Sequence, residues 1–326
     1  MEKIKIGICG YGNLGKGVEK EISKANDMEL KAIFTRRNPK EIQKNSNVEI
    51  LQNNRISDFK NDIDVMIMCG GSAIDLPNQV PEMAKIFNTV DSFDTHAKIS
   101  EYFEKVNESA ILANKTCTIC GGWDPGLFSL IRLYGESILP QGNLHTFWGK
   151  GVSQGHSNAI RKIKGVKDGI QYTIPNNEII KDIRSGKIIN INDKEKHIRQ
   201  CFVVAENGAN KEEIESEIKK MPNYFEGYKT EVNFITKEEL KEKHNKLFHG
   251  GLVIHTGKTG DVNKQIMEYH LKLDSNPEFT ASVLIALARA TYRINKFGIY
   301  GAKTILEIPP FLLSEKSIQE LRKTIL

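Results

Sequence analysis

The sequence predicts an α/β protein with a Rossmann-type, doubly wound parallel sheet, followed by a second α+β domain with a mixed sheet. Three observations support this prediction. The chain opens on a β-branched run that stops at a glycine cluster, residues 4–15, IKIGICGYGNLG. Apolar runs and helical patterns then alternate as far as residue 121, as in a parallel sheet. Longer alternating segments follow, as in a mixed or antiparallel sheet.

The glycine cluster fits the pattern G-x-G-x-x-G of dinucleotide-binding loops. Its residues are Gly10, Tyr11, Gly12, Asn13, Leu14 and Gly15. The first glycine allows a sharp turn, the second lets the backbone approach a pyrophosphate, and the third lets the next helix pack closely. A helix from about Asn13 would direct free N–H groups at the phosphates. Because a strand pattern precedes the motif and a helix pattern follows it, we expect a dinucleotide site rather than a plain strand–helix turn.

The tip of the second predicted strand carries arginines where an NAD site usually has a carboxylate. It reads Thr35, Arg36 and Arg37. A carboxylate at this point binds the ribose 2′-OH of NAD, whereas guanidinium groups hold the 2′-phosphate of NADP. The sequence therefore predicts NADP. The alternative is that the two arginines belong to an ordinary solvated surface.

The first part of the chain contains the elements of the predicted parallel sheet. Strands are expected at 4–9, 30–34, 64–69, 88–92 and 116–121, with helices that include 79–87 and 97–113. Such sheets bind ligands beyond the carboxyl ends of their strands. We therefore assign Gly70 and Ser72 to the cofactor site, and the loops 91–96 and 121–126 to the reacting groups. They carry the acids Asp91, Asp94 and Asp124, for which a helix cap or a turn is the alternative role.

The second part of the chain follows a different pattern. A helix is expected from Pro125 to about Ser137, with further helices at 210–220, 237–245 and 278–296. Alternating segments at 145–149, 169–174, 196–206, 230–236 and 250–257 predict strands. Residues 302–313 are expected to return to the first domain. The predicted division is a dinucleotide-binding domain of 1–121 completed by 297–326, and a substrate-binding and dimerisation domain of 122–296.

Composition excludes several classes of function. A chain of 326 residues with 39% hydrophobic content and a net charge of +5 has room for about two packed domains. Its lysines alternate with glutamates, so no basic stripe for nucleic acid is present. No apolar run approaches the roughly 18 residues of a membrane span, and the N-terminus reads as a strand rather than a signal segment. We expect a soluble cytoplasmic protein that binds neither nucleic acid nor membrane.

The cysteines do not predict a metal site. Five cysteines, an odd number, suit a reducing compartment. Cys117 and Cys120 form one C-x-x-C within a predicted strand, where residues three apart point to opposite faces. We therefore expect no metal.

A wider set of segments is far more specific than the glycine loop. They read GYGNLGKGVEK, IFTRR, VDSFDTH, GGWDPGLFS, HTFWGKGVSQGHSNAIRKIKGV, QYTIP, RQCFVVAE, MPNYFEGY, EVNFI, HGG and LKLDSNPEFTAS. In these segments the chain closely resembles the meso-diaminopimelate dehydrogenase family. The resemblance implies a homodimer of bacterial lysine biosynthesis that uses NADP⁺ and water. It implies that meso-2,6-diaminopimelate is converted to L-2-amino-6-oxopimelate and ammonia.

The resemblance also implies roles for individual residues. Asp94 and Asp124 would act at the D centre of the substrate, together with Trp123, Trp148, Gln154 and Gly155. Thr173, Arg199, His249 and Asn276 would bind the distal L end. Arg199 can grip a carboxylate bidentately. Without the resemblance, each has an ordinary alternative as core, strand-surface or turn residue. The general base stays open between an aspartate and a bound water.

Two rival interpretations share part of these features. Homoserine dehydrogenase and dihydrodipicolinate reductase begin with a similar glycine loop, but they do not account for HTFWGKGVSQGHS or GGWDPG. A non-catalytic NADPH-binding regulator would keep Gly10 to Gly15 and the two arginines. It would not need polar groups for a substrate with two amino-acid ends.

Overall fold

The computed structural model describes residues 2–43, 45–187 and 191–326, and its contacts form two compact units. Unit 1 comprises Met1–Leu130 and Pro277–Leu326, and unit 2 comprises Ile131–Asn276. These limits differ from the expected division at 121/122 and 296/297. The long helix α9 (Asn276–Lys296) lies almost wholly in unit 1, because its Leu284 and Leu287 share a hydrophobic core with the first strand.

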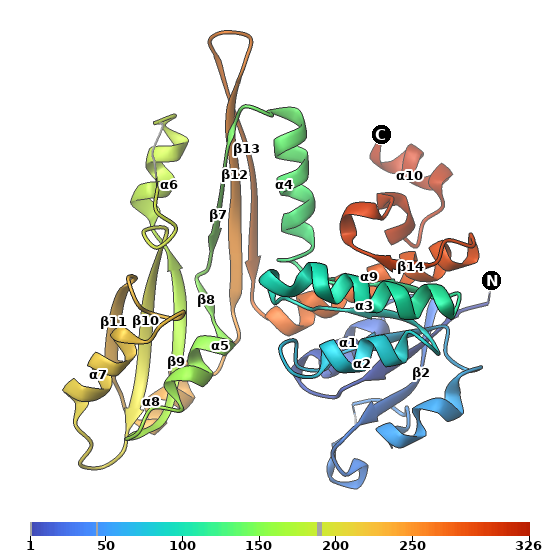
Figure 1. Ribbon diagram of the computed structural model, residues 1–326, viewed down its shortest axis with the longest axis horizontal. Helices are drawn as coiled ribbons and strands as arrows, with labels where there is room; N and C mark the ends of the chain where they lie inside the picture. The colour runs from blue at the N-terminus through green and yellow to red at the C-terminus, as the bar shows by residue number, and fades with distance from the viewer. Residues whose placement is uncertain (1, 44, 188–190) are drawn as a thin grey trace. The chain divides into compact units, whose positions relative to one another are not determined.

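Unit 1 contains the predicted parallel sheet (Figure 1). Its seven strands lie in the order β14-β6-β5-β4-β1-β2-β3. Their bounds are β1 Ile4–Cys9, β2 Met28–Thr35, β3 Ile50–Gln52, β4 Val65–Met68, β5 Asn88–Asp91, β6 Thr116–Thr118 and β14 Gly301–Lys303. Every neighbouring pair is parallel, and β14 pairs with β6 as expected for a returning C-terminal segment.

Helices cover both faces of this sheet, which confirms the doubly wound fold. On one face, Ile6 and Ile67 share a core with α1 (Asn13–Ile22) and α9. On the other face, Met66 and Met68 pack with α2 (Leu76–Met83) and α3 (Ile99–Leu112). Neighbouring residues of β4 thus enter opposite cores, as the strand period of two requires. The strands of a sheet that is buried on both faces have nearly continuous apolar sequences.

Several predicted bounds in unit 1 are wrong by a few residues. β6 ends at Thr118 instead of 121, because Cys120 has a positive φ of 57° that a strand cannot accommodate. Helix α4 (Leu127–Ile138) begins after Pro125, which lies in the turn before it. α2 begins three residues before the expected 79. The short helix α10 (Ile318–Ile325) was not expected.

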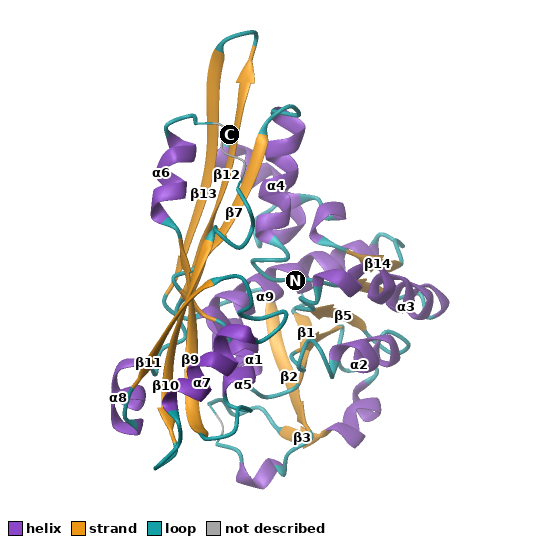
Figure 2. Ribbon diagram, turned by 60° about the vertical axis from the view of Figure 1, so that its left-hand side comes forward, coloured by secondary structure: helices purple, strands orange, loops and turns teal. Residues whose placement is uncertain are grey.

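Unit 2 contains two sheets rather than one (Figure 2). The four-stranded sheet has the order β11-β10-β9-β8, with β8 Gly151–Val152, β9 Val166–Pro175, β10 His197–Ala205 and β11 Lys229–Phe234. It is mixed, since β10 pairs parallel with β11 and antiparallel with β9. The three-stranded sheet is antiparallel and has the order β13-β12-β7, with β7 Asn143–Trp148, β12 His249–Thr259 and β13 Asn263–Leu273.

Helices pack on each sheet of unit 2. α5 (Gln154–Ile160) and α7 (Lys211–Lys220) supply Ile160, Ile214 and Ile218 to a core on the mixed sheet. α6 (Asn177–Arg184) places Ile180 and Ile183 against β7 and β12. α8 (Lys237–Lys243) completes the helices of this unit. The strand β13 and the helix α6 were missed. The alternation of Met267, Tyr269, Leu271 and Leu273 with polar residues was the available signal for β13, although most of its residues are exposed.

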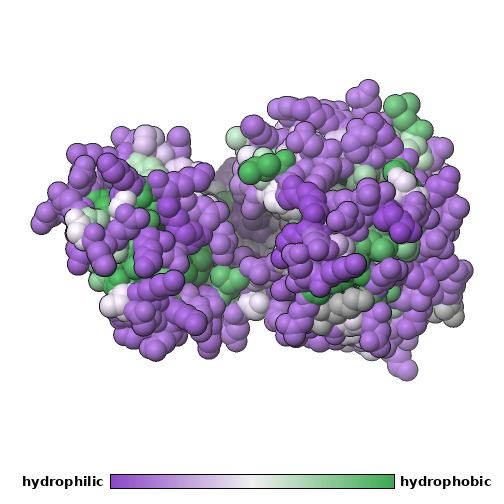
Figure 3. Space-filling model, turned by 90° about the horizontal axis from the view of Figure 1, so that it is seen from below, coloured by the Kyte–Doolittle hydropathy of each residue, from purple (hydrophilic) through white to green (hydrophobic). Residues whose placement is uncertain are grey.

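The surface in Figure 3 is mostly hydrophilic, with hydrophobic side chains in scattered groups. Within the described residues, none of the helices has both the length and the apolar character needed to cross a membrane.

A buried ion pair fixes α9 within unit 1. Arg289, which is 4% exposed, donates to both carboxylate oxygens of Asp27 at 2.6 and 2.8 Å. It also donates to the carbonyl oxygen of Leu313 at 2.8 Å and to Glu315 at 3.2 Å. Burial alone would raise the pKa of Asp27, but the hydrogen bonds and charge of Arg289 outweigh it and the pKa is lowered. The pair links α9 to the turn before β2 and to the C-terminal segment.

We expect Arg289→Met to lower the free energy of unfolding by about 1.5–3 kcal/mol, because the half-buried carboxylate of Asp27 loses its charge-assisted hydrogen bonds. The loss should be seen as a lower urea midpoint at neutral pH. It should shrink as the pH falls through the lowered pKa of Asp27, since protonated Asp27 no longer needs the cation. Lys20→Met removes the exposed pair with Glu278 and should cost no more than about 1 kcal/mol. Equal losses in the two variants would contradict this account.

Candidate functional site

The glycine loop between β1 and α1 has the geometry of a phosphate-binding turn. Gly10 has a φ of 100°, which favours glycine. A Cβ on Gly15 would clash with the carbonyl oxygen of Gly10, so the helix start and the turn are in close contact. A Cβ on Gly12 would meet nothing within 4 Å, so the backbone there is open to a ligand. The turn at Gly10, the open backbone at Gly12 and the close contact at Gly15 agree with the expected geometry, so the residues present fit a dinucleotide. Their contact with a pyrophosphate stays a prediction.

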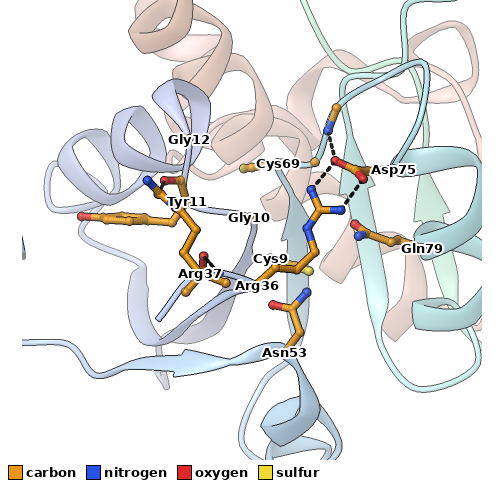
Figure 4. A pocket seen from close by; sticks show the side chains of 13 residues that line it. Cys9, Gly10, Tyr11, Gly12, Arg36, Arg37, Asn53, Cys69, Asp75 and Gln79 are labelled. Atoms are coloured by element: carbon orange, nitrogen blue, oxygen red, sulfur yellow. Dashed lines mark hydrogen bonds and ion pairs between the residues drawn. The ribbon is translucent and has the colours of Figure 1, made fainter. Parts of the chain in front are cut away.

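A pocket of about 290 Å³ lies at the carboxyl ends of β1, β2 and β4 (Figure 4). It brings together seven of the predicted cofactor residues, which are Gly10, Tyr11, Gly12, Thr35, Arg36, Arg37 and Gly70. Cys9, Asn53, Cys69, Gly71, Asp75 and Gln79 also line it. Asn13, Leu14, Gly15 and Ser72, which were predicted with them, lie outside this lining.

The two arginines are held differently. Arg36 makes a bidentate pair with Asp75 at 2.8 and 2.9 Å, and Asp75 also accepts the N–H of Gly71 at 2.9 Å (Figure 4). Arg37 donates to the carbonyl oxygen of Tyr11. Asp75 was missed by sequence reasoning, although its place just beyond β4 was a signal. Both guanidinium groups therefore lie at the pocket, where they suit an anionic phosphate.

A buried carboxylate anchors the side chain of Tyr11. Glu19 on α1 is 4% exposed and accepts from the hydroxyl of Tyr11, from Ser46 at 2.6 Å and from Asn45 at 3.1 Å. Burial and the bond to Glu19 raise the pKa of Tyr11 to about 12. The Tyr11 ring is thus fixed while its carbonyl oxygen receives Arg37.

The acids of the next strand ends lie in unit 1, and Asp94 does not cap a helix. Asp94 is exposed, and its N–H donates to Ser72 Oγ at 2.9 Å. Thr95 and Lys98 occupy the N-cap positions of the following helical turns, and neither side chain makes a cap bond. Asp124 is half-buried in the turn after β6, beside the buried Trp123. The cap role weighed for Asp94 is therefore wrong.

The C-x-x-C does not have the geometry assumed for it. Cys117 lies in β6, but Cys120 lies beyond the end of that strand. The argument against a shared metal from opposite faces of one strand was therefore wrong. Both are free and buried, and burial raises the pKa of Cys117 to about 12 and also raises that of Cys120. Neither is a thiolate at neutral pH. Throughout the described residues, no three His, Cys, Asp or Glu side chains are grouped to hold a metal.

Unit 2 brings Arg199 and Thr173 together on its mixed sheet. They are register partners on β10 and β9, and Arg199 Nη1 donates to Thr173 Oγ1 at 2.6 Å. The guanidinium carbon lies 4.2 Å from the ring centre of Tyr228. Burial lowers the pKa of Arg199, and Nε is buried with no hydrogen-bond partner in the described parts of the chain. This half-buried cation is a candidate for binding an anion.

Trp148 rests on a histidine that sequence reasoning did not assign. His197 on β10 is buried, and its Nε2 accepts the backbone N–H of Trp148 at 2.8 Å. The two rings stack with centres 5.2 Å apart. Burial, with a smaller contribution from Arg199, lowers the pKa of His197 to about 4, so it is a neutral acceptor at neutral pH. No local sequence signal links the ends of these two strands.

Among the remaining predicted residues of unit 2, Asn276 lies close to the segment of His249, and Gln154 and Gly155 lie on a separate helix. A Cβ on Gly151 would clash with the His249 ring, and Gly151 is the register partner of Thr173. The N–H of Asn276 donates to the carbonyl oxygen of Leu247 at 3.0 Å, two residues before His249. Gln154 and Gly155 begin α5 and are exposed.

His156, near the start of α5, has contacts at both ring nitrogens that leave neither free to carry a proton. Nδ1 pairs with Ser153 Oγ at 2.7 Å, and Nε2 pairs with the carbonyl oxygen of Tyr224 at 3.1 Å. Burial lowers its pKa to about 4. These contacts favour a structural role.

Comparisons with known proteins agree with this geometry. The family model for the diaminopimelic acid dehydrogenase C-terminal domain matches residues 122–275. The meso-diaminopimelate D-dehydrogenase of Ureibacillus thermosphaericus is 56% identical over 326 residues, which is 100% of both chains. This chain belongs to the meso-diaminopimelate D-dehydrogenase family. The rival families with a similar glycine loop are thereby set aside.

Solved structures of this dehydrogenase family superpose along nearly the whole chain. A mutant meso-dapdh of Clostridium tetani E88 with DAP has a TM-score of 0.95 and 53% identity, over 99% of this chain and 100% of that chain. An engineered D-amino acid dehydrogenase bound to NADP⁺ has a TM-score of 0.88 and 41% identity, over 99% of this chain and 100% of that chain.

We expect Arg36→Ala combined with Arg37→Ala to raise the KM for NADP⁺ by about 100-fold, with NAD⁺ use little changed. The reason is the loss of charge-assisted bonds to the 2′-phosphate, each worth roughly 1.5–3 kcal/mol. Because Arg37 also contacts the Tyr11 carbonyl, Arg36→Ala alone serves as the variant that leaves the glycine loop intact. Unaltered steady-state kinetics with NADP⁺ would rule out this role for the arginines.

Proposed function

We propose that the chain catalyses NADP⁺-dependent, reversible oxidative deamination at the D centre of meso-2,6-diaminopimelate. With water and NADP⁺, the products are L-2-amino-6-oxopimelate, ammonium, NADPH and a proton. Family membership, a relative solved with DAP and a relative solved with NADP⁺ support this proposal. Bacterial lysine biosynthesis, a homodimer and a cytoplasmic location stay predictions.

The half-buried Arg199 carries the proposal, because no carboxylate among the residues that the structure describes acts on its guanidinium and its Nε has no hydrogen-bond partner there. A cation removed from water needs a compensating anion. Thr173 Oγ1 already receives Arg199 at 2.6 Å and the amide of Gln171 at 3.4 Å. Its hydroxyl hydrogen is therefore directed to a further acceptor. A carboxylate that bonds both side chains matches the distal, L end of the substrate.

Supporting evidence comes from the relative of Clostridium tetani E88. That mutant, solved with DAP, carries replacements that include Gln154, Thr173, Arg199, His249 and Asn276. The same residue types stand at the same numbers in this chain. We infer that these residues of unit 2 bind substrate, with His249 and Asn276 at the distal end and Trp148, Gln154 and Gly155 nearer the reacting end.

The reacting end needs groups that bind an ammonium and manage protons. When bound, NADP⁺ would supply the acceptor for the hydride of the D-centre Cα. We assign the ammonium to Asp94 and Asp124 and the wall of the site to Trp123. One of these carboxylates, or a water that it holds, takes the proton as water adds to the imine carbon. No lysine occupies the described strand-end loops 70–72, 91–96 and 121–126, so a lysine base is not part of this scheme.

The direct test is NADPH absorbance with NADP⁺ and the meso, LL and DD isomers of diaminopimelate, with D-lysine as a further substrate. Formation of NADPH with the meso isomer is expected, and the LL isomer should be inert because it lacks a D centre. A flat trace with every isomer, in protein that binds NADPH, would instead favour the non-catalytic regulator.

Arg199→Met tests the division of the substrate into two ends. An unpaired substrate carboxylate costs about 2–5 kcal/mol, and 1.4 kcal/mol is tenfold. We therefore expect kcat/KM for meso-diaminopimelate to fall by about thirty-fold or more. Slow oxidation of a D-amino acid without a distal carboxylate should change little. Asp124→Asn should depress both substrates together. Equal losses for both substrates in Arg199→Met would refute the division.

A further inference from the structure

The carboxylate of Asp91 is buried at the end of β5 and joins three elements of unit 1. Its side chain has no exposed surface. Oδ1 accepts the N–H of Phe93 at 2.8 Å and that of Cys120 at 3.2 Å, and Oδ2 accepts the hydroxyl of Tyr102 at 2.7 Å. All three partners are donors, so both oxygens are satisfied.

These bonds connect the two loops that carry the proposed reacting acids. Phe93 directly precedes Asp94, and Cys120 begins the segment that leads to Asp124. The carbonyl oxygen of Asp91 also accepts the N–H of Gly121 at 2.6 Å. Asp94 is in turn joined to the loop after β4, because its N–H donates to Ser72 Oγ at 2.9 Å. One residue thus fixes the spacing between neighbouring strand ends.

The surroundings of Asp91 are apolar or uncharged. The titratable groups that face it are Tyr102 from α3, Cys117 from β6 and Cys120 from the following loop, with Asp94 further out. None of them is a cation. Burial raises the pKa of Asp91 to about 6, although its three hydrogen bonds oppose the shift. A raised pKa means that the unfolding free energy falls as the pH rises from about 4 to 6.

We propose that Asp91 is a positioning residue for the reaction, which holds the loops of Asp94 and Asp124 at a fixed spacing through its two backbone hydrogen bonds. The inference rests on the proposed roles of those two acids. Asp91 has no exposed surface and so does not itself contact substrate. Its function is to accept hydrogen bonds, and its negative charge is not required.

Three variants separate shape, charge and hydrogen bonding. Asp91→Asn keeps Oδ1 as the acceptor, and its amide can donate to the Tyr102 oxygen. Asp91→Leu has a similar shape but accepts nothing. Asp91→Glu keeps the charge and the acceptors but displaces them by one methylene. The matched control is Thr89→Val, a near-isosteric change at another buried position of β5.

The measurements are kcat, KM for meso-diaminopimelate and the dissociation constant of NADPH. Because a shift of about 1 Å in a reacting group can cost about 100-fold, Asp91→Leu and Asp91→Glu should lose kcat by up to about 100-fold. NADPH affinity should stay within about threefold. Asp91→Asn and Thr89→Val should keep kcat within about twofold. Asp91→Asn should also keep the pH profile of kcat while abolishing the fall in stability between pH about 4 and 6.

Several results would overturn the proposal. They are a folded Asp91→Leu or Asp91→Glu with parental kcat, equal losses of kcat and NADPH affinity, or an inactive but folded Asp91→Asn. If Asp91→Leu does not fold, the kcat values of Asp91→Glu and Asp91→Asn still test whether Asp91 positions the two loops. Failure of the parent to oxidise meso-diaminopimelate would instead overturn the proposed function. The rate of backbone hydrogen exchange in segments 92–96 and 119–126 should rise in Asp91→Leu. This measurement tests the hydrogen bonds between Asp91 and the two loops independently of turnover.

Discussion

A parallel sheet that is buried on both faces can present polar groups only where its strands end, and the chemistry of unit 1 depends on this constraint. Neighbouring residues of β4 enter opposite cores, so neither face has room for an exposed charge. The glycine turn after β1, the arginines after β2 and the acids after β5 and β6 consequently gather at one edge. Parallel strands place their carboxyl ends together, which is why residues far apart in the chain line one region.

In unit 2 the candidate polar residues lie within the strands of the sheets and not only at strand ends. Thr173 and Arg199 are register partners and satisfy each other in part, while His197 is kept neutral by burial and accepts the Trp148 N–H. Partly satisfied buried polar groups are costly. The buried Nε of Arg199 is therefore best understood as a group that a ligand completes.

The sequence was informative wherever a local pattern determined the structure. The strand, glycine turn and helix at 4–22 follow from β-branched residues and close packing at Gly15, so they could be predicted. Long-range pairing could not. The ion pair of Arg36 with Asp75, the contact of His197 with Trp148 and the membership of α9 in unit 1 depend on which strands become neighbours. No local pattern encodes that choice. The roles of the unit 2 residues came from family resemblance and not from physics.

Unit 1 contains two arginine–aspartate pairs, and their burial determines whether each pair stabilises the fold or leaves its arginine available to a ligand. Arg289 is 4% exposed, so separating it from Asp27 would leave a buried charge, and the pair is a permanent part of the fold. The Arg36 side chain is 67% exposed, and an exposed pair of this kind contributes about 0–1 kcal/mol. If the predicted cofactor contact forms, a 2′-phosphate carries more charge than Asp75 and would share or replace it as the partner of Arg36 at small cost. Asp75 thus keeps the guanidinium ordered at the pocket without making it unavailable to a cofactor.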